Sequence, residues 1–270
     1  MWESWAKPAH TASPALGQGR ISSMNTVLIT GGSRGIGRAT AILAAARGWS
    51  VAVNYRKEAD AAAQTAAQVQ HRGGRAITVR GDVSVEADVV AMFARAQADL
   101  GPLRGVVINA GITAPAMPLA QMSAERLQRM FQVNVLGAYL CAREAARALS
   151  QAHGGQGGSV VLVSSAASRF GSPGEYVDYA GSKAALDTLA IGLAKELGGE
   201  GVRVNAVRPG LIETEIHATT GDPDRARKLG RATPLGRAGR PEEIAEAIVW
   251  LLSDAASYVT GSILDIAGGR

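Results

Sequence analysis

The stretch Thr30-Gly31-Gly32-Ser33-Arg34-Gly35-Ile36-Gly37 decides the fold of this chain. It follows a short apolar run at 27–30, and a helical pattern begins directly after it and extends to about Arg47. Small residues at such a turn let the backbone approach a pyrophosphate closely, and the N–H groups and dipole of the new helix favour its negative charge. A P-loop is excluded because no Gly-Lys-Ser/Thr sequence ends the turn. A methyltransferase also uses such a turn, but it normally places a carboxylate after the second strand.

Strand-like and helix-like segments alternate along the rest of the chain. Right-handed crossovers between parallel strands place such helices on both faces of one sheet. The predicted fold class is therefore α/β, a single-domain Rossmann fold with a doubly wound parallel seven-stranded sheet. The predicted strands are 27–30, 50–55, 76–80, 103–109, 159–164, 202–207 and 263–266. The predicted helices after the first are about 59–71, 85–100, 124–149 with Ser123 as its N-cap, 177–197 and 242–252.

The first 23 residues differ in character from the remainder of the chain. They lack periodicity and lack the apolar run of a secretory signal, so we expect residues 1–23 to be a flexible N-terminal extension and 24–270 to be the Rossmann-type domain. No stretch approaches the ~20 apolar residues that a membrane span needs. The one cysteine, Cys141, fits a reducing compartment. We therefore expect a cytoplasmic protein that makes no membrane contact.

The balance of charges bears on partners. The formal net charge is +5, which would suit a nucleic acid or an acidic protein. However, Lys and Arg form no run, and aromatic residues, only 4% of the chain, do not interleave with them. We interpret the charge as a mildly basic enzyme surface and expect no nucleic-acid partner.

The end of the second predicted strand bears on cofactor choice. It reads Val53-Asn54-Tyr55-Arg56-Lys57. A protein that selects NAD places Asp or Glu near the position of Tyr55 to bind the ribose 2′-OH, whereas here two cations follow. Arg34 in the glycine turn is predicted to face the same place, where two guanidinium groups would clamp a 2′-phosphate. We predict NADP(H) as the preferred cofactor and NAD(H) as a second one. The alternative is that Arg34 and Arg56 are solvated surface residues.

A tyrosine and a lysine stand four residues apart in Tyr179-Ala180-Gly181-Ser182-Lys183. On a helix this spacing puts both side chains on one face, one turn apart. A nearby ammonium lowers the pKa of a phenol toward neutrality, which makes the phenol a useful proton donor and acceptor. Tyr176 is also near, but Ala180 occupies the position four residues after it.

With these residues the chain resembles the short-chain dehydrogenase/reductase family, in its classical branch. The resemblance covers residues 24–270 and depends on several motifs that occur in the family's order. These are Thr30–Gly37, Asp82-Val83, Asn109-Ala110-Gly111, Asn134, Ser165, Tyr179 with Lys183, Arg208-Pro209-Gly210 with Thr214, and the ending Tyr258–Gly261 through Ala267–Gly269.

The resemblance implies a catalytic role for four residues. Tyr179 transfers the proton to or from the substrate oxygen. Lys183 holds the ribose hydroxyls of the nicotinamide nucleotide and depresses the pKa of the tyrosine. Ser165 hydrogen-bonds the reacting carbonyl, and Asn134 orders a water that links Lys183 to solvent. Taken alone, Ser165 would be interpreted as a turn residue and Asn134 as a satisfied buried polar group.

The resemblance also implies a cofactor-binding set, and it includes no metal ligand. Asp82 and Val83 contact the adenine, although Asp82 alone would be interpreted as a helix-entry residue beside Ser84. The full set is Gly31, Ser33, Arg34, Gly35, Ile36, Gly37, Tyr55, Arg56, Asp82, Val83, Asn109, Ala110, Gly111, Tyr179, Lys183, Pro209, Gly210, Ile212 and Thr214.

Two positions depart from the family's pattern. Ile108 replaces the first Asn of the fourth-strand motif, and the segment from Ser165 to Tyr179 is one residue longer than usual. A longer segment alters one wall of the substrate pocket, so a relative's substrate does not transfer directly.

The sequence leaves several functions open. The leading prediction is an NADP(H)-dependent oxidoreductase that moves a hydride between nicotinamide and a small carbonyl or alcohol substrate. Alternatives are a 3-oxoacyl-[acyl-carrier-protein] reductase, a sugar dehydrogenase of the glucose 1-dehydrogenase kind, and a dinucleotide-sensing regulator without catalysis. The resemblance further implies a homotetramer. Apolar residues that would form its contacts are Val133, Leu136, Tyr139, Leu140, Trp250 and the strand 263–266.

Overall fold

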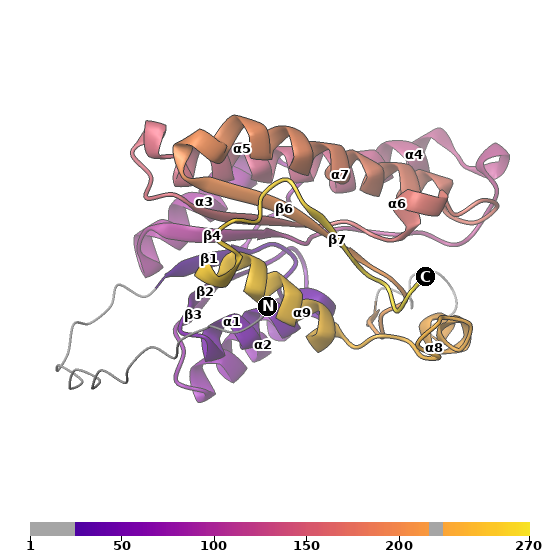
Figure 1. Cartoon of the computed structure of the whole chain (residues 1–270), viewed down its shortest axis with the longest axis horizontal. Helices are drawn as coiled ribbons and strands as arrows, with labels where there is room; N and C mark the ends of the chain where they lie inside the picture. Colours follow the sequence, from indigo (N-terminus) through magenta and orange to yellow (C-terminus); the bar gives the residue numbers. More distant parts are fainter. Residues whose placement is uncertain (1–24, 216–223) are drawn as a thin grey trace, which may run out of the picture.

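The computed structural model describes residues 25–215 and 224–270 (Figure 1). Its centre is a seven-stranded parallel sheet of order β3-β2-β1-β4-β5-β6-β7, which confirms the predicted fold class. The predicted extension at 1–23 lies outside the described residues. The strands are β1 (Thr26–Ile29), β2 (Ser50–Tyr55), β3 (Ala76–Arg80), β4 (Leu103–Ile108), β5 (Gly158–Val163), β6 (Val202–Pro209) and β7 (Ile263–Ile266).

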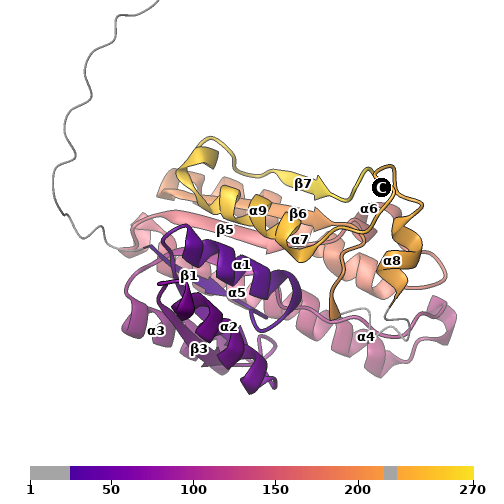
Figure 2. The ribbon, with the colours of Figure 1, turned by 90° about the horizontal axis from the view of Figure 1, so that it is seen from below.

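Two helical layers cover the sheet (Figures 1 and 2). One face is covered by α3 (Glu86–Leu100), α5 (Gly137–Leu149) and α7 (Val177–Leu197), and the other by α1 (Gly35–Ala46), α2 (Ala59–His71) and α9 (Pro241–Leu252). Shorter helices are α4 (Ala124–Phe131), α6 (Ala167–Phe170) and α8 (Arg225–Gly230).

The alternation of side chains along each strand produces the two cores. In β1, Leu28 packs with the α3, α5 and α7 side, while Val27 and Ile29 pack with the α1, α2 and α9 side. The central strands β1 and β5 are buried on both faces and almost entirely apolar, as expected of a parallel sheet covered by helices, whereas the edge strands β3 and β7 are partly exposed. The sheet therefore fixes the carboxyl ends of its strands as one rigid edge.

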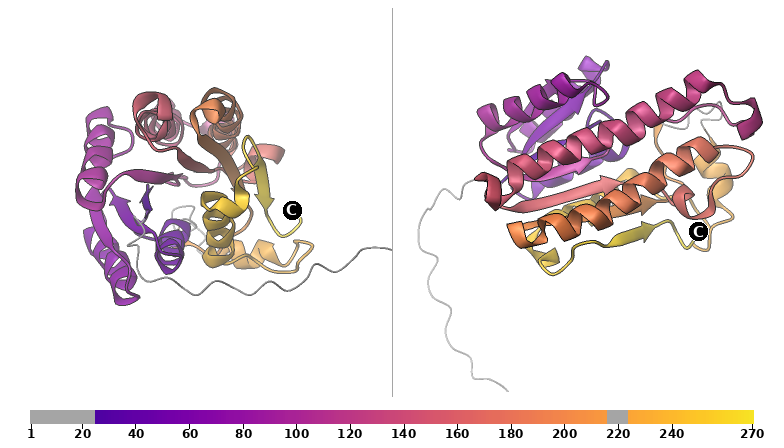
Figure 3. Two further views of the ribbon diagram at one scale, coloured as in Figure 1. Left: turned by 60° about the vertical axis from the view of Figure 1, so that its left-hand side comes forward. Right: turned by 90° about the horizontal axis from the view of Figure 1, so that it is seen from above.

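The predicted helix at 124–149 is observed as three joined pieces. Ser123 caps α4 as predicted, since its Oγ accepts a hydrogen bond of 3.2 Å from the Arg126 N–H. Between α4 and α5 the turn widens into a π-helical segment, η2 (Gln132–Leu136). The combined helix and α7 lie side by side over the strands (Figure 3). Such widened turns occur frequently at functional sites, and this one carries Asn134.

Among the helices within 25–215 and 224–270, none combines the length and the apolar character that crossing a membrane requires.

Candidate active site

The glycine-rich turn is held against the end of β4 by hydrogen bonds. The Asn109 amide donates to the carbonyl oxygens of Thr30 and Gly31 at 2.9 and 3.1 Å, and the Thr30 hydroxyl accepts from the Asn109 N–H at 2.9 Å. Gly31 has φ +62°, a conformation that favours glycine. A Cβ on Gly37 would lie 2.3 Å from the Gly31 carbonyl oxygen, so only glycine allows this approach of turn and helix.

The start of α1 offers its N–H groups to the pocket. Within the described residues α1 has no side-chain cap, and its first turn contains no acidic residue. Uncapped N–H groups at a helix start bind phosphate well, because the helix dipole adds to their hydrogen bonds. The residues present therefore fit a dinucleotide, with its pyrophosphate at Ser33–Ile36.

A cavity of about 460 Å³ runs along the carboxyl ends of the strands from this turn to α7. The strand order of the sheet reverses between β1 and β4, because β2 and β3 lie on one side of β1 and β4–β7 on the other. Parallel α/β sheets bind ligands in the crevice at such a switch point. Most of the predicted site residues line it. These are Gly31, Ser33, Arg34, Gly35, Ile36, Tyr55, Arg56, Asp82, Val83, Asn109, Ala110, Gly111, Ser165, Tyr179, Lys183, Pro209, Gly210, Ile212 and Thr214.

Two predicted residues lie behind this wall. Gly37 supports the turn from inside α1, and Asn134 is only 1% exposed. The Asn134 Oδ1 accepts from the Ile112 N–H at 2.8 Å, and its Nδ2 donates to the Ile112 carbonyl and to the Ser182 Oγ at 3.0 Å each. A Cβ on Gly111 would lie 3.3 Å from both Asn134 Oδ1 and Lys183 Nζ. Both polar atoms of the Asn134 amide are thus hydrogen-bonded, and its Oδ1 and the Lys183 ammonium both border the space beside Gly111.

The end of the cavity beside β2 is cationic but not free of ion pairs. Arg56 Nη1 lies 3.3 Å from Asp82 Oδ2, and Arg129 Nη2 lies 3.8 Å from the same oxygen. The other oxygen, Asp82 Oδ1, accepts from the Ser84 N–H and hydroxyl at 3.0 and 2.6 Å. Burial alone would raise the pKa of Asp82, but the Ser84 hydrogen bonds and the Arg56 guanidinium together lower it. Asp82 is therefore a helix-entry residue and an arginine partner at once.

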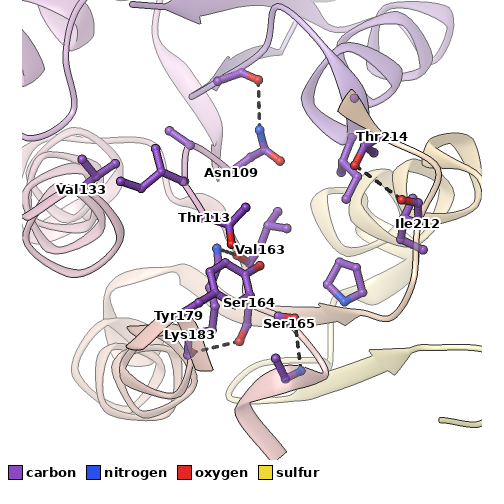
Figure 4. Close-up of a pocket in the computed structure, with 18 of the residues that line it drawn as sticks. Asn109, Thr113, Val133, Val163, Ser164, Ser165, Tyr179, Lys183, Ile212 and Thr214 are labelled. Atoms are coloured by element: carbon purple, nitrogen blue, oxygen red, sulfur yellow. Dashed lines mark hydrogen bonds between the residues drawn. The ribbon is translucent and has the colours of Figure 1, made fainter. Parts of the chain in front are cut away.

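Tyr179 and Lys183 extend from α7 toward Ser165, which follows β5 (Figure 4). The Lys183 ammonium donates a 2.7 Å hydrogen bond to the Val163 carbonyl oxygen. It lies 5.8 Å from the centre of the Tyr179 ring. The three side chains thus meet where β5 ends, at the floor of the cavity.

The pKa values of this pair differ from the expectation. Burial raises the pKa of Tyr179 above its ordinary value near 10, and the hydrogen bond with the Ser165 side chain opposes this rise. Burial also lowers the pKa of Lys183 to about 8, against the effect of the Asp187 charge. In the protein without cofactor, desolvation therefore raises the pKa of the Tyr179 phenol more than the neighbouring Lys183 ammonium lowers it.

No role was predicted from the sequence for Glu175 and Arg225 on the substrate side of the cavity, and Tyr176 was considered only as an alternative to Tyr179. Arg225, at the start of α8, lies 2.6 Å from the Glu175 carboxylate and 5.1 Å from the centre of the Tyr176 ring. All three side chains line the cavity. Glu175 and Tyr176 belong to the segment between Ser165 and Tyr179, whose added length predicted an altered wall. Arg225 is 50 positions away from Glu175, and no local pattern marked it.

A parallel sheet of this order, with a glycine-rich turn at its switch point and a Tyr–Lys pair facing it, defines a dinucleotide-binding oxidoreductase of the Rossmann type. A family model described as Enoyl-(Acyl carrier protein) reductase matches residues 31–270. The chain is 51% identical over 247 residues to "Uncharacterized oxidoreductase YgfF" of Escherichia coli (strain K12), covering 92% of this chain and all of the relative.

Two further comparisons agree. The chain is 41% identical to "L-rhamnose 1-dehydrogenase (NAD(P)(+))" of Sphingomonas sp. (strain SKA58), over 90% of this chain and 95% of the relative. A short-chain type dehydrogenase/reductase from Mycobacterium marinum superposes with a TM-score of 0.84 at 37% identity, over 91% and 94% of the two chains. The chain belongs to the short-chain dehydrogenase/reductase family. It is an NAD(P)-dependent enzyme that acts on CH–OH donors or the corresponding carbonyls.

Proposed function

We propose that the protein is an NADP(H)-dependent carbonyl reductase or alcohol dehydrogenase in which Tyr179 is the general acid and base. The observation that carries this proposal is the placement of Tyr179, Lys183 and Ser165 on the wall of the same cavity as the glycine turn. A dinucleotide that lies along the strand ends from that turn would bring its nicotinamide to these three side chains.

Each side chain has a task in this chemistry. The bound nicotinamide supplies or accepts the hydride. Ser165 donates a hydrogen bond to the substrate oxygen, and Tyr179 gives that oxygen a proton in the reducing direction or takes one in the oxidising direction. Lys183 binds the ribose hydroxyls and places a positive charge beside the phenol. Asn134 positions the backbone at Ile112, and through it the wall next to Lys183.

The preference for NADP(H) depends on the cations at the β2 end of the cavity. Arg34 and Arg56 both line this end, and Tyr55 stands where a carboxylate would favour NAD. The ion pair with Asp82 neutralises part of the Arg56 charge, which reduces the preference. We therefore propose NADP(H) as the better cofactor and NAD(H) as an accepted one.

A second candidate is a sugar or polyol dehydrogenase. The Glu175–Arg225 ion pair and the Tyr176 ring give the substrate side both charged hydrogen-bonding groups and a flat apolar surface. Hydroxylated rings suit such a mixed wall, because their hydroxyls bond to charged groups and their C–H faces pack on aromatic rings. An acyl-carrier-protein reductase has weaker support, namely the net charge of +5.

Assembly is proposed to be a cytoplasmic homotetramer. The structure corrects one of the predicted contact residues, because Val133 is only 5% exposed and belongs to the core, while Leu140 is partly buried against the core. Leu136, Tyr139 and Trp250 do remain between 39% and 44% exposed. Light scattering at micromolar concentration tests the proposal, and a monomer would contradict it.

The decisive experiment for the function is a turnover panel. Aldehydes, ketones, aldoses and cyclic diols are offered with NADPH, NADH and their oxidised forms, in both directions. The proposal expects turnover of a carbonyl or alcohol that is faster with NADP(H), while a preference for aldoses would favour the second candidate. Absence of turnover on every substrate class would contradict both.

A further inference from the structure

Asp187 is a buried carboxylate to which the proposed chemistry gives no task. It lies on α7 four residues after Lys183, so the two side chains share one face of the helix, one turn apart. Asp187 is 6% exposed and Lys183 is 4% exposed. A charged pair so far from water stays ionised only when each charge has compensation nearby.

The bonding of Asp187 is one-sided. Its Oδ2 accepts two hydrogen bonds from Arg208, from Nε at 3.1 Å and from Nη2 at 2.9 Å. Its Oδ1 is buried and has no hydrogen-bond partner among the residues that the structure describes. Buried polar atoms are normally satisfied, so a free carboxylate oxygen requires an explanation. A carboxylate kept for its charge, rather than for its hydrogen bonds, provides one.

Arg208 belongs to a row of alternating charges that leads from the surface to the catalytic helix. It extends from β6, and its Nη1 lies 3.7 Å from Asp265 Oδ1 on β7. Asp265 in turn lies 2.8 Å from Arg169 on α6. The row therefore connects four elements, α6, β7, β6 and α7, and Asp187 is its member closest to Lys183 along the chain.

The surroundings of Lys183 show why this charge matters. On its own helix Lys183 lies 5.8 Å from the Tyr179 ring centre, and Asp187 follows it one turn later. Its ammonium donates to the Val163 carbonyl of β5, and Gly111 and the neutral Asn134 are close by. Among the charged groups described around it, Asp187 is the one that favours the ammonium form. Arg208 is the cation next to that carboxylate.

We propose that Asp187 is the positioning residue of Lys183, holding it as an ammonium ion in its buried site, and that Arg208 sets how much of the Asp187 charge Lys183 experiences. The catalytic meaning of this assignment rests on the proposed function, because it assumes that Lys183 acts in its charged form. The physical claim about the lysine does not depend on any substrate.

The experiment titrates Lys183 directly in the full-length protein. The sequence contains five lysines, so a protein labelled with ¹³C at lysine Cε gives few signals, and Lys183→Met identifies the one of interest. The wild-type midpoint is expected near 8. Because Asp187→Asn removes the favourable charge, the midpoint should fall by about one pH unit. Arg208→Gln leaves the carboxylate less neutralised, so the midpoint should rise.

A matched control separates charge from loss of structure. Asp178 is an equally buried carboxylate on α7, and it is bound by Arg126 at 2.8 and 3.2 Å. Asp178→Asn should therefore lower thermal stability as Asp187→Asn does, while leaving the Lys183 midpoint in place. A merely structural role of Asp187 would not shift the midpoint in opposite directions in Asp187→Asn and Arg208→Gln. Asp187→Glu keeps the charge and should keep the midpoint near that of wild type.

The kinetic readout is the pH profile of carbonyl reduction. Turnover should decline above the Lys183 midpoint, and this alkaline limb should move to lower pH in Asp187→Asn. A midpoint in Asp187→Asn that coincides with wild type overturns the proposal. If that variant does not fold, the double variant Asp187→Asn/Arg208→Gln removes both charges of the Asp187–Arg208 pair together, and a midpoint at or above wild type overturns the proposal there. Failure of the proposed function would appear instead as shifted midpoints without any carbonyl reduction.

Discussion

The two ends of the cavity are built from different parts of the chain. At the glycine-rich end, one short segment, Ser33–Ile36, lines the space proposed for the phosphates, and Asn109 bonds the start of the turn, Thr30 and Gly31, to the sheet. At the substrate end, the wall consists of side chains from segments far apart, such as Glu175 and Arg225. Backbone-built sites tolerate few substitutions, whereas side-chain walls vary without disturbing the sheet. We therefore expect the first end to set the cofactor class and the second end to set the substrate.

The largest effect is expected where the two ends meet, at Tyr179. Tyr179→Phe removes the phenolic hydroxyl but keeps the ring. Because the hydroxyl is the proposed acid and base, turnover should fall about a thousandfold. NADPH affinity should remain within about twofold, since the phosphate and adenine ends are untouched. Steady-state kinetics and NADPH fluorescence titration measure the two quantities.

Tyr176→Phe is the matched control for this loss. Tyr176 is a buried cavity residue on the same segment, and it has no lysine four residues after it. Its variant should retain turnover within a few-fold. If Tyr179→Phe did the same, Tyr179 would not be the proton donor.

The next effect tests the backbone-built end through Gly37. A Cβ at this position would overlap the Gly31 carbonyl oxygen at 2.3 Å. Gly37→Ala must therefore push the turn away from the helix, and it should lower the free energy of unfolding by about 2–3 kcal/mol. NADPH affinity should fall at least tenfold, as measured by titration of protein shown by circular dichroism to be folded.

Gly192→Ala provides the comparison for Gly37. A Cβ there meets no described atom within 4 Å, and the residue is in the middle of α7. Alanine is the better helix former, so this variant should gain up to about 1 kcal/mol. Equal behaviour of the two variants would mean that the turn is not tightly packed.

The fold was predictable because each strand carries its own signal. The strands are short, mostly apolar segments between turn residues, and the predicted bounds agree with the observed ones within two residues, as for β6 at Val202–Pro209. The turn at Thr30–Gly37 was equally predictable, because its tight backbone requires small residues at consecutive positions of the sequence. Interactions between residues close in the sequence determine these elements, so the sequence alone predicts them.

The parts that escaped prediction depend on contacts between distant segments. The π-helical turn that carries Asn134 could not be predicted, because the same residue types form α-helical and π-helical turns. The ion pairs Arg56–Asp82 and Glu175–Arg225 join positions 26 and 50 residues apart. Such pairs depend on how loops pack over the strand ends, and no periodicity encodes that packing.

A moderate effect is expected for cofactor choice at Arg56. Arg56→Ala removes a partner of the 2′-phosphate and leaves the Asp82 charge less compensated beside it. The preference for NADPH over NADH should fall about tenfold, equivalent to about 1.4 kcal/mol. Arg34→Ala should act in the same direction, and Tyr55→Asp combined with a neutral residue at 56 should reverse the preference.

The control for this prediction is Arg47→Ala. Arg47 is an exposed arginine with an ion pair of 3.4 Å to Glu246, and it does not line the cavity. The dissociation constants of both cofactors should stay at wild-type values in this variant. Equal wild-type affinities for NADPH and NADH would show that Arg34 and Arg56 are ordinary surface residues.

The smallest effect is expected at the substrate wall, at Arg225. Arg225→Gln breaks the ion pair with Glu175 and weakens the stacking on Tyr176, which is worth about 0.5–2 kcal/mol as a cation–π contact. The KM for hydroxylated substrates should rise about three- to tenfold, while KM for small unsubstituted ketones and the dissociation constant of NADPH stay unchanged. Arg227→Gln is the control: Arg227 is on the same helix but its side chain is 70% exposed and does not line the cavity. This variant should change neither KM value and should leave the NADPH dissociation constant unchanged. The decisive observation is a KM that rises for hydroxylated substrates but not for small ketones. A similar rise for both classes would indicate a general disturbance of the cavity wall. A change in cofactor affinity would mean that the two ends of the cavity are not independent.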